Sequence, residues 1–79
     1  MDDGNPQQRM YIRLAASLRE EIESGMRAPG SQLPSITSLC TLYGLSRRTG
    51  GHAMQVLEHE GLVYREPGLG YFVAAHHRL

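Results

Sequence analysis

The sequence predicts a mainly α-helical domain in which three helices are followed by a small β-hairpin. Apolar residues recur at three- and four-residue steps in three segments, which is the spacing of one buried face of a helix. Each segment begins with a capping serine or with Asn-Pro, and a glycine follows its end. Two β-rich runs separated by a Pro-Gly turn come after the third segment, as in a hairpin.

The first helix is expected to start at Asn5, as the N-cap, with Pro6 at the first helical position, where its missing N–H costs nothing. Gly25 is expected as the C′ residue just past its end. One face of this helix is apolar and the other is charged, with Arg13, Glu20 and Glu23 outside and Tyr11, Leu14, Ala15, Leu18 and Ile22 inside. Pro29-Gly30 then predicts a turn, and residues 31–33 are long enough only for a stub of strand.

The second and third helices are short and closely spaced. Ser35 is the expected N-cap of the second helix, and Gly44 is expected to end it. Ser46 is the expected N-cap of the third helix, which Gly61 is expected to end. Their inward faces are expected to contain Ile36, Leu39, Cys40 and Tyr43, and then Gly50, Ala53, Met54 and Leu57. Two helices joined by a turn with a glycine form a helix-turn-helix, whose second helix can lie in a DNA major groove.

The runs 62–65 and 71–74 are the expected strands of the hairpin, and residues 66–70 connect them. Together these elements predict a winged helix-turn-helix, with the hairpin as the wing. We expect residues 1–10 to hold the lead-in and the start of the first helix, residues 11–74 to form the domain, and residues 75–79 to be a frayed, flexible tail in which His76 and His77 are solvated.

Length and composition favour a binding module over an enzyme, because 79 residues suffice for one small core and not for a second domain with a ligand pocket. The longest uncharged stretch, residues 28–46, is broken by prolines and glycines, and no signal segment opens the chain, so we expect a cytoplasmic protein without a membrane span. Cys40 is the single cysteine and is expected to be a buried, inert thiol. We expect no catalytic residues, no metal site and no cofactor.

The formal net charge is zero, but the charges are unevenly distributed. Residues 26–55 hold Arg27, Arg47 and Arg48 and no acid, so the middle of the chain is locally +3. All basic residues are arginine, which suits bidentate contact with phosphate or guanine and is equally explained by a GC-rich coding genome. The distribution, more than the total, is compatible with nucleic acid.

The order and spacing of the motifs resemble the DNA-binding domain of GntR-type repressors, from about Tyr11 to Val73. The matching segments are Tyr11–Ala15, Leu18–Arg19, Ile22–Gly25, Pro29–Ser35, Gly44–Arg47, Ala53–Leu57, Glu60–Val63 and Gly68–Val73. The resemblance implies that the third helix enters the major groove and the wing contacts the adjacent backbone of double-stranded DNA.

The resemblance also implies which residues reach DNA. Arg47 matches the family arginine that contacts it, with Ser46, Arg48 and Thr49 in the same helical turn, where the helix dipole also favours phosphate. Ser35 and Thr37 begin the second helix and would face the DNA backbone; Thr37 stands where the family often has arginine. On the wing we expect contacts from Arg65, Gly68 and Gly70, since glycines let the tip turn tightly and approach the sugar-phosphate chain.

The largest departure from the family is Gly50-Gly51, where an inward aliphatic residue and a DNA-contacting arginine are usual. Two glycines should cost roughly 2 kcal/mol of helix propensity, leave a small void and remove a contact at Gly51. His52 either replaces part of that contact or is a helix histidine without a role. Pro67 and Leu69 also replace the polar wing tip that is common in the family.

The expected function is therefore sequence-specific binding of a palindromic operator by a bacterial transcription regulator, with pairing of two copies on the DNA. No small-molecule effector is expected for this chain. The alternative is a winged-helix protein-interaction module with weak or no DNA binding, which the double glycine, the apolar wing tip and the zero net charge favour.

Overall fold

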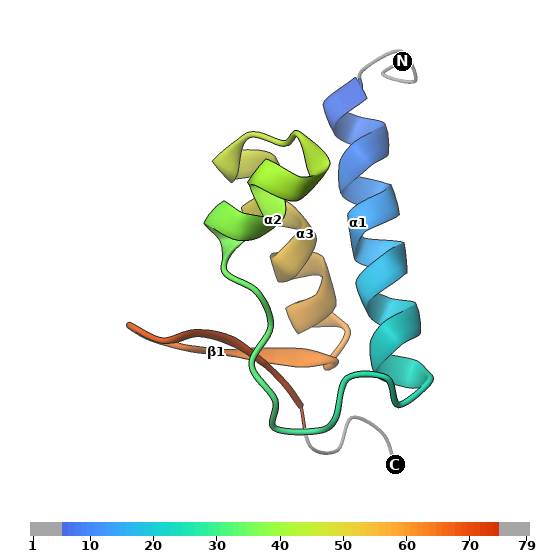
Figure 1. The fold of residues 1–79 in the computed structure, drawn as a ribbon, viewed down its shortest axis with the longest axis vertical. Helices are drawn as coiled ribbons and strands as arrows, with labels where there is room; N and C mark the ends of the chain where they lie inside the picture. Colours follow the sequence, from blue (N-terminus) through green and yellow to red (C-terminus); the bar gives the residue numbers. More distant parts are fainter. Residues whose placement is uncertain (1–5, 75–79) are drawn as a thin grey trace.

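Three helices and a two-stranded hairpin make up the fold of this computed structural model, which describes residues 6–74 (Figure 1). Helix α1 (Pro6–Glu23) runs along one side, helix α3 (Arg47–His59) packs against it, and helix α2 (Ile36–Tyr43) covers α3 from the other side. Strands β1 (Val63–Glu66) and β2 (Gly70–Val73) extend sideways beneath α2 and α3. The prediction of a winged helix-turn-helix is confirmed.

The amphipathic pattern of α1 decides which side faces α3. Leu14, Ala15, Leu18 and Ile22 are buried, whereas Arg13, Glu20 and Glu23 are exposed, as their spacing predicts. The helix ends at Glu23, and Gly25 follows with φ of 89°, close to the predicted C′ position. Asn5, the predicted N-cap, and the tail with His76 and His77 lie outside the described residues.

The two predicted serine caps are present. The Ser35 hydroxyl accepts the Ser38 N–H at 3.0 Å, and the Ser46 hydroxyl accepts the Thr49 N–H at 3.1 Å, so each short helix begins with a satisfied amide. Gly44 separates the helices with φ of 69°, a left-handed conformation that glycine adopts without steric cost. This turn sets the angle between α2 and α3.

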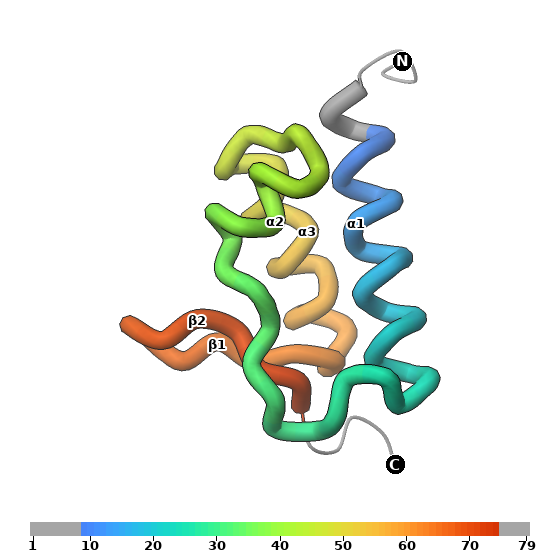
Figure 2. The backbone as a smooth tube through the Cα atoms, in the orientation of Figure 1, coloured from blue at the N-terminus to red at the C-terminus, as the bar shows by residue number. Residues whose placement is uncertain are grey.

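The hairpin is antiparallel, with Val63 opposite Val73 and Arg65 opposite Tyr71. Both strands are shifted by one residue from the predicted ranges 62–65 and 71–74. The predicted strand stub at residues 31–33 is confirmed as a single bridge between Gln32 and Phe72, and the Leu33 N–H donates to the Tyr71 carbonyl at 2.9 Å. Figure 2 shows this segment crossing the hairpin on its way from α1 to α2.

One hydrophobic core joins all five elements. Its most deeply buried large side chains are Leu14, Met54, Leu57 and Val73, from α1, α3 and β2. Cys40 is buried as predicted, and its thiol donates to the Ser46 carbonyl at 3.2 Å. The void predicted beside Gly50 is wrong: a Cβ built on Gly50 would lie 2.6 Å from the Cys40 sulfur, so the thiol already fills that space.

Candidate nucleic-acid interface

The N-terminal turns of α2 and α3 lie side by side and present polar groups to solvent. Arg47 extends from α3 toward α2, where its Nη1 donates to the Thr37 hydroxyl at 3.3 Å. Both side chains are exposed. The structure thus brings together two of the predicted DNA-contacting residues, which lie ten positions apart on different helices.

The hydroxyl groups of the two capping serines already make contacts within their own helices. The hydroxyls of Ser35 and Ser38 lie 3.1 Å apart, and those of Ser46 and Thr49 lie 2.9 Å apart. The first N–H groups of a helix have no backbone acceptor within it, and Ser46 satisfies the one at Thr49. An anion at this exposed end would meet the positive end of the helix dipole and the side chain of Arg47.

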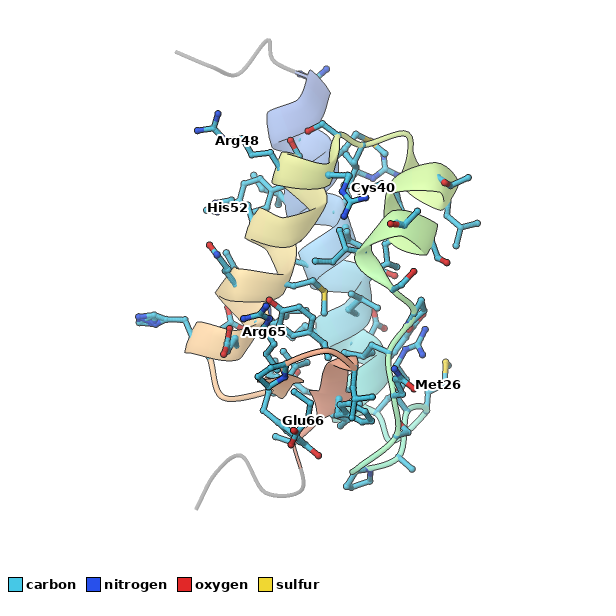
Figure 3. All side chains as sticks on the ribbon, turned by 90° about the vertical axis from the view of Figure 1, so that its left-hand side faces the viewer. Met26, Cys40, Arg48, His52, Arg65 and Glu66 are labelled. Carbon is cyan, nitrogen blue, oxygen red and sulfur yellow. The ribbon has the colours of Figure 1, made fainter. Side chains whose placement is uncertain are left out.

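Arg48 and His52 lie on a different flank of α3. Arg48 points outward from the first turn, and His52 follows one turn later on the same side (Figure 3). The His52 ring contacts Tyr11 of α1, with ring centroids 4.4 Å apart and an interplanar angle of 58°. His52 therefore belongs to the side of α3 next to α1, whereas Gly51 belongs to the side next to α2 and the wing.

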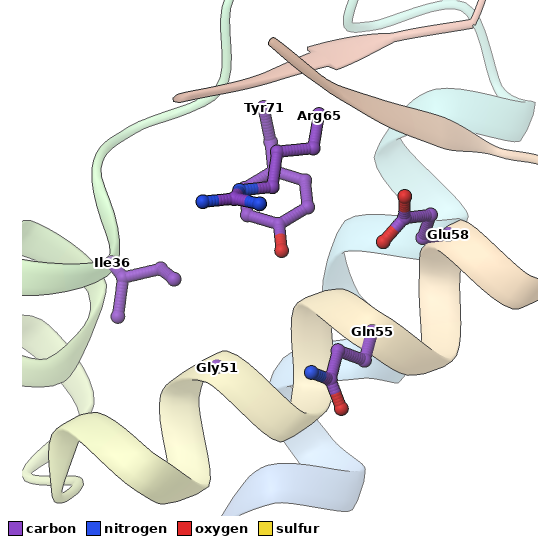
Figure 4. Close-up of a pocket in the computed structure, with 6 residues that line it drawn as sticks. All are labelled: Ile36, Gly51, Gln55, Glu58, Arg65 and Tyr71. Atoms are coloured by element: carbon purple, nitrogen blue, oxygen red, sulfur yellow. The ribbon is translucent and has the colours of Figure 1, made fainter. Parts of the chain in front are cut away.

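An open groove of about 540 Å³ runs between α3 and the wing. Figure 4 shows Ile36 at one end, Gly51 and Gln55 along α3, and Arg65 and Tyr71 of the hairpin opposite them. Gly51 adds no side chain to the groove; a Cβ there would meet only the Ile36 Cδ1 atom, at 3.9 Å. The predicted residues Gly51 and Arg65 thus face one space from different elements.

Besides Ile36, which was expected on the inward face of its helix, sequence reasoning missed three residues of this groove: Gln55, Glu58 and Tyr71. Helical spacing could have found the first two, since positions 55 and 58 follow Gly51 by four and seven residues on one face of a helix. Tyr71 could be found only from the hairpin register, which pairs it with Arg65. Glu58 is an acid at the rim of an otherwise neutral and basic groove, which opposes the approach of phosphate.

The wing tip is a tight turn that the side chain of Gln32 holds in place. The Leu69 N–H donates to the Glu66 carbonyl at 2.9 Å, and Gly68 has φ of 83°, which places glycine where a type II turn requires it. The Gln32 side-chain amide donates to the Leu69 carbonyl at 2.6 Å and so braces the tip against the strand stub. The Leu69 side chain is 63% exposed, which leaves an apolar group at the end of the wing.

Away from this face, a bidentate ion pair joins α1 to the end of α3. The Arg19 guanidinium donates two hydrogen bonds of 2.8 Å to the Glu60 carboxylate, which lowers the pKa of that carboxyl from its usual value of 4.5. Among the described residues, no cluster of three or more His, Cys, Asp or Glu side chains could hold a metal ion. No helix within residues 6–74 is long and apolar enough to span a membrane.

Comparison with known proteins identifies relatives over most of the chain. A sequence model of the bacterial regulatory proteins of the gntR family matches residues 10–73. The uncharacterized HTH-type transcriptional regulator YdcR of Escherichia coli K12 is 45% identical over 64 residues, which cover 81% of this chain and 14% of YdcR. The chain therefore spans only a small part of the length of this relative.

Solved structures show the same fold. The DNA-binding domain of AraR in complex with operator ORX1 superposes with a TM-score of 0.79 at 31% identity, covering 82% of this chain and 78% of that one. A GntR family transcriptional regulator from Listeria monocytogenes superposes with a TM-score of 0.78 at 25% identity, covering 95% of this chain and 63% of that one. The AraR domain carries the operator in its own structure.

Proposed function

Because this chain belongs to the gntR family of bacterial regulatory proteins, we propose that it binds double-stranded operator DNA sequence-specifically as the DNA-binding domain of a transcription regulator. The observation that carries the proposal is the convergence of Arg47, Thr37 and the Ser46-capped N-terminus of α3 at one exposed end of that helix. The similarity to a domain solved with its operator supports it. We propose residues 11–74 as the binding unit, acting in the cytoplasm, where bacterial DNA is located.

In the proposed complex, the N-terminal half of α3 lies in the major groove. Arg47 contacts a guanine edge or a phosphate, and Ser46, Arg48 and Thr49 line the same turn, where backbone and base edges are both within reach. Ser35 and Thr37, at the start of α2, contact the backbone of the flanking strand. His52 is turned toward Tyr11, so its contact with DNA is limited to a phosphate on the α1 side.

The wing lies on the DNA backbone next to the major groove that α3 occupies. Arg65 faces the groove from β1 and supplies the cationic contact, while Gly68 and Gly70 allow the turn between the strands to approach the sugar-phosphate chain closely. Leu69 contributes apolar contact with sugars, because it cannot hydrogen-bond to bases.

We further propose that two copies bind a palindromic operator and pair only on DNA, and that this segment by itself responds to no small molecule. The apolar side chains of the helices and the hairpin are shared by one core, which leaves no long apolar stripe for a stable dimer among residues 9–74. Sedimentation with and without operator tests this: a tight dimer in the absence of DNA would contradict it.

Selection of bound sequences from a random duplex pool, followed by salt titration of the winner, tests the function itself. A DNA-binding domain should enrich one motif, and its affinity should fall linearly with the logarithm of the salt concentration. The second candidate, a protein-interaction module, is favoured by the exposed Leu69 and by Gly51. It would give no enriched motif and no such salt dependence.

A further inference from the structure

Tyr71 combines a buried ring with a hydroxyl that opens into the groove between α3 and the wing. The residue is only 9% exposed and its ring belongs to the hydrophobic core. Its oxygen nevertheless points away from the hairpin and toward the Gly51 turn of α3 (Figure 4). The polar end of the side chain is thus held in place by the packing of the rest.

This hydroxyl has no hydrogen-bond partner among the residues whose side chains the structure describes, 9–74, yet it is not sealed from solvent. A buried tyrosine usually finds a partner for its O–H, because an unsatisfied polar group is costly. Here the open groove is the only direction from which a partner can come, since the ring is packed on the core.

The hairpin register adds a cation beside this donor. Arg65 and Tyr71 are directly opposite each other on neighbouring strands, on the face that also carries the buried Val63 and Val73. Tyr64 and Phe72 occupy the other face, where their rings stack with centroids 5.7 Å apart. The two polar ends that reach the groove from the wing are therefore a guanidinium and a neutral O–H donor, a pair suited to an oxyanion.

The geometry of any duplex places such an oxyanion here, if α3 occupies a major groove as proposed above. One sugar-phosphate strand separates the major groove of DNA from the neighbouring minor groove. If α3 lies in the major groove and the wing lies beyond that strand, the strand must pass between α3 and the wing. In the protein, the space between α3 and the wing is the groove lined by Gly51, Gln55 and Tyr71.

We propose that Tyr71 is a DNA-contacting residue whose hydroxyl donates a hydrogen bond to a phosphodiester oxygen of the strand that passes between α3 and the wing. Arg65 supplies the charge at the same phosphate. The Gln55 amide, which is exposed one turn beyond Gly51 and has no partner among the described residues, is a second neutral donor along the same strand. This inference rests on the proposed function.

The test compares Tyr71→Phe with Tyr64→Phe, two substitutions that remove one hydroxyl each from opposite faces of the wing. Both proteins and the wild type are titrated against a fluorescein-labelled duplex of mixed sequence at low salt, because a phosphate contact is independent of sequence. Tyr71→Phe should weaken binding roughly tenfold, the loss expected for one hydrogen bond to a charged acceptor. Tyr64→Phe should bind as the wild type does.

Two further measurements separate this role from a structural one. The slope of log affinity against log salt should be unchanged in Tyr71→Phe, because a neutral donor releases no counterion, whereas Arg65→Gln should lower it by about one unit. The thermal midpoint of Tyr71→Phe should equal that of the wild type, since the ring is retained. Equal binding by Tyr71→Phe and wild type would overturn this inference alone, as would equal losses in both tyrosine variants. A wild type that binds no duplex would overturn the proposed function together with it.

Discussion

The sulfur of Cys40 and the α-carbon of Gly50 share one small space where α2 meets α3. A Cβ added to Gly50 would lie 2.6 Å from that sulfur, far inside van der Waals contact, and the next neighbour, the Ile36 Cγ2 atom, is 3.5 Å away. The thiol is fixed by its hydrogen bond to the Ser46 carbonyl. The small residue at position 50, in the first turn of α3, is therefore complemented by the larger Cys40 side chain of α2 that packs against it.

This relationship predicts a sign change in a double-mutant cycle. Gly50→Ala alone should destabilise the domain by about 1 kcal/mol, because overpacking outweighs the gain in helix propensity. In a Cys40→Ala background the sulfur is gone, and the same substitution should stabilise by about 1 kcal/mol. Urea unfolding of the four proteins measures the coupling; additive effects would show that Cys40 does not constrain position 50.

Gly51 should behave differently, because a Cβ there makes only an ordinary contact with Ile36. Gly51→Ala is expected to stabilise the domain by about 0.5 to 1 kcal/mol through helix propensity. Gly51→Arg should stabilise similarly and also bind duplex more tightly than Gly51→Ala, with a salt slope steeper by up to about one unit. Equal duplex binding by the two variants at low salt would place this side of α3 away from DNA.

The sequence predicted the helix ends and the winged helix-turn-helix arrangement, but not the particular contacts between side chains of different elements. Ser35, Gly44 and Ser46 mark helix ends because caps and left-handed turns are satisfied within a few residues, so their signals are local. The space beside Gly50 depends on Cys40, ten residues away on another helix, and a helix pattern alone contains no information about it. The predicted void was wrong for that reason.

The candidate interface divides in the same way. Thr37 was predicted from the family resemblance, and Arg47 from the resemblance together with its place in the first turn of α3. Their hydrogen bond depends on how α2 and α3 are joined. The groove residues Gln55 and Tyr71 come from a helix and a strand whose mutual placement no periodicity specifies. His52 was left open between two roles, and its contact with Tyr11 depends on the packing of α1 against α3.

The negative charge of Glu58 should weaken DNA binding relative to a neutral side chain at the same position. Glu58→Gln removes a negative charge from the rim of the groove, and at low salt it should tighten duplex binding by up to about fivefold, the equivalent of roughly 1 kcal/mol. The gain should shrink as salt rises, because exposed charges are screened. Glu20→Gln makes the same charge change on the outer face of α1 and is the matched control. Equal effects of the two would indicate only a change in net charge.

The Arg19–Glu60 pair predicts a small, pH-dependent contribution to stability. Both side chains are partly exposed, at 34% and 39%, so Glu60→Gln should cost less than about 1 kcal/mol at neutral pH. Because the pair lowers the pKa of Glu60, its contribution is present above the ordinary carboxyl pKa and is lost as the pH falls through the lowered one. Unfolding curves of variant and wild type should therefore converge in acid, and a difference that persists there would contradict an electrostatic origin.

The central claim, that the N-terminal end of α3 contacts DNA, is tested most directly by the salt dependence of duplex binding in Arg47→Ala and Arg13→Ala. Both variants lose one exposed arginine, one from the start of α3 and the other from the outer face of α1. Arg47→Ala should bind more weakly, with a slope of log affinity against log salt lower by about one unit. Arg13→Ala should retain the wild-type slope. Identical slopes and affinities in the two variants would contradict the account.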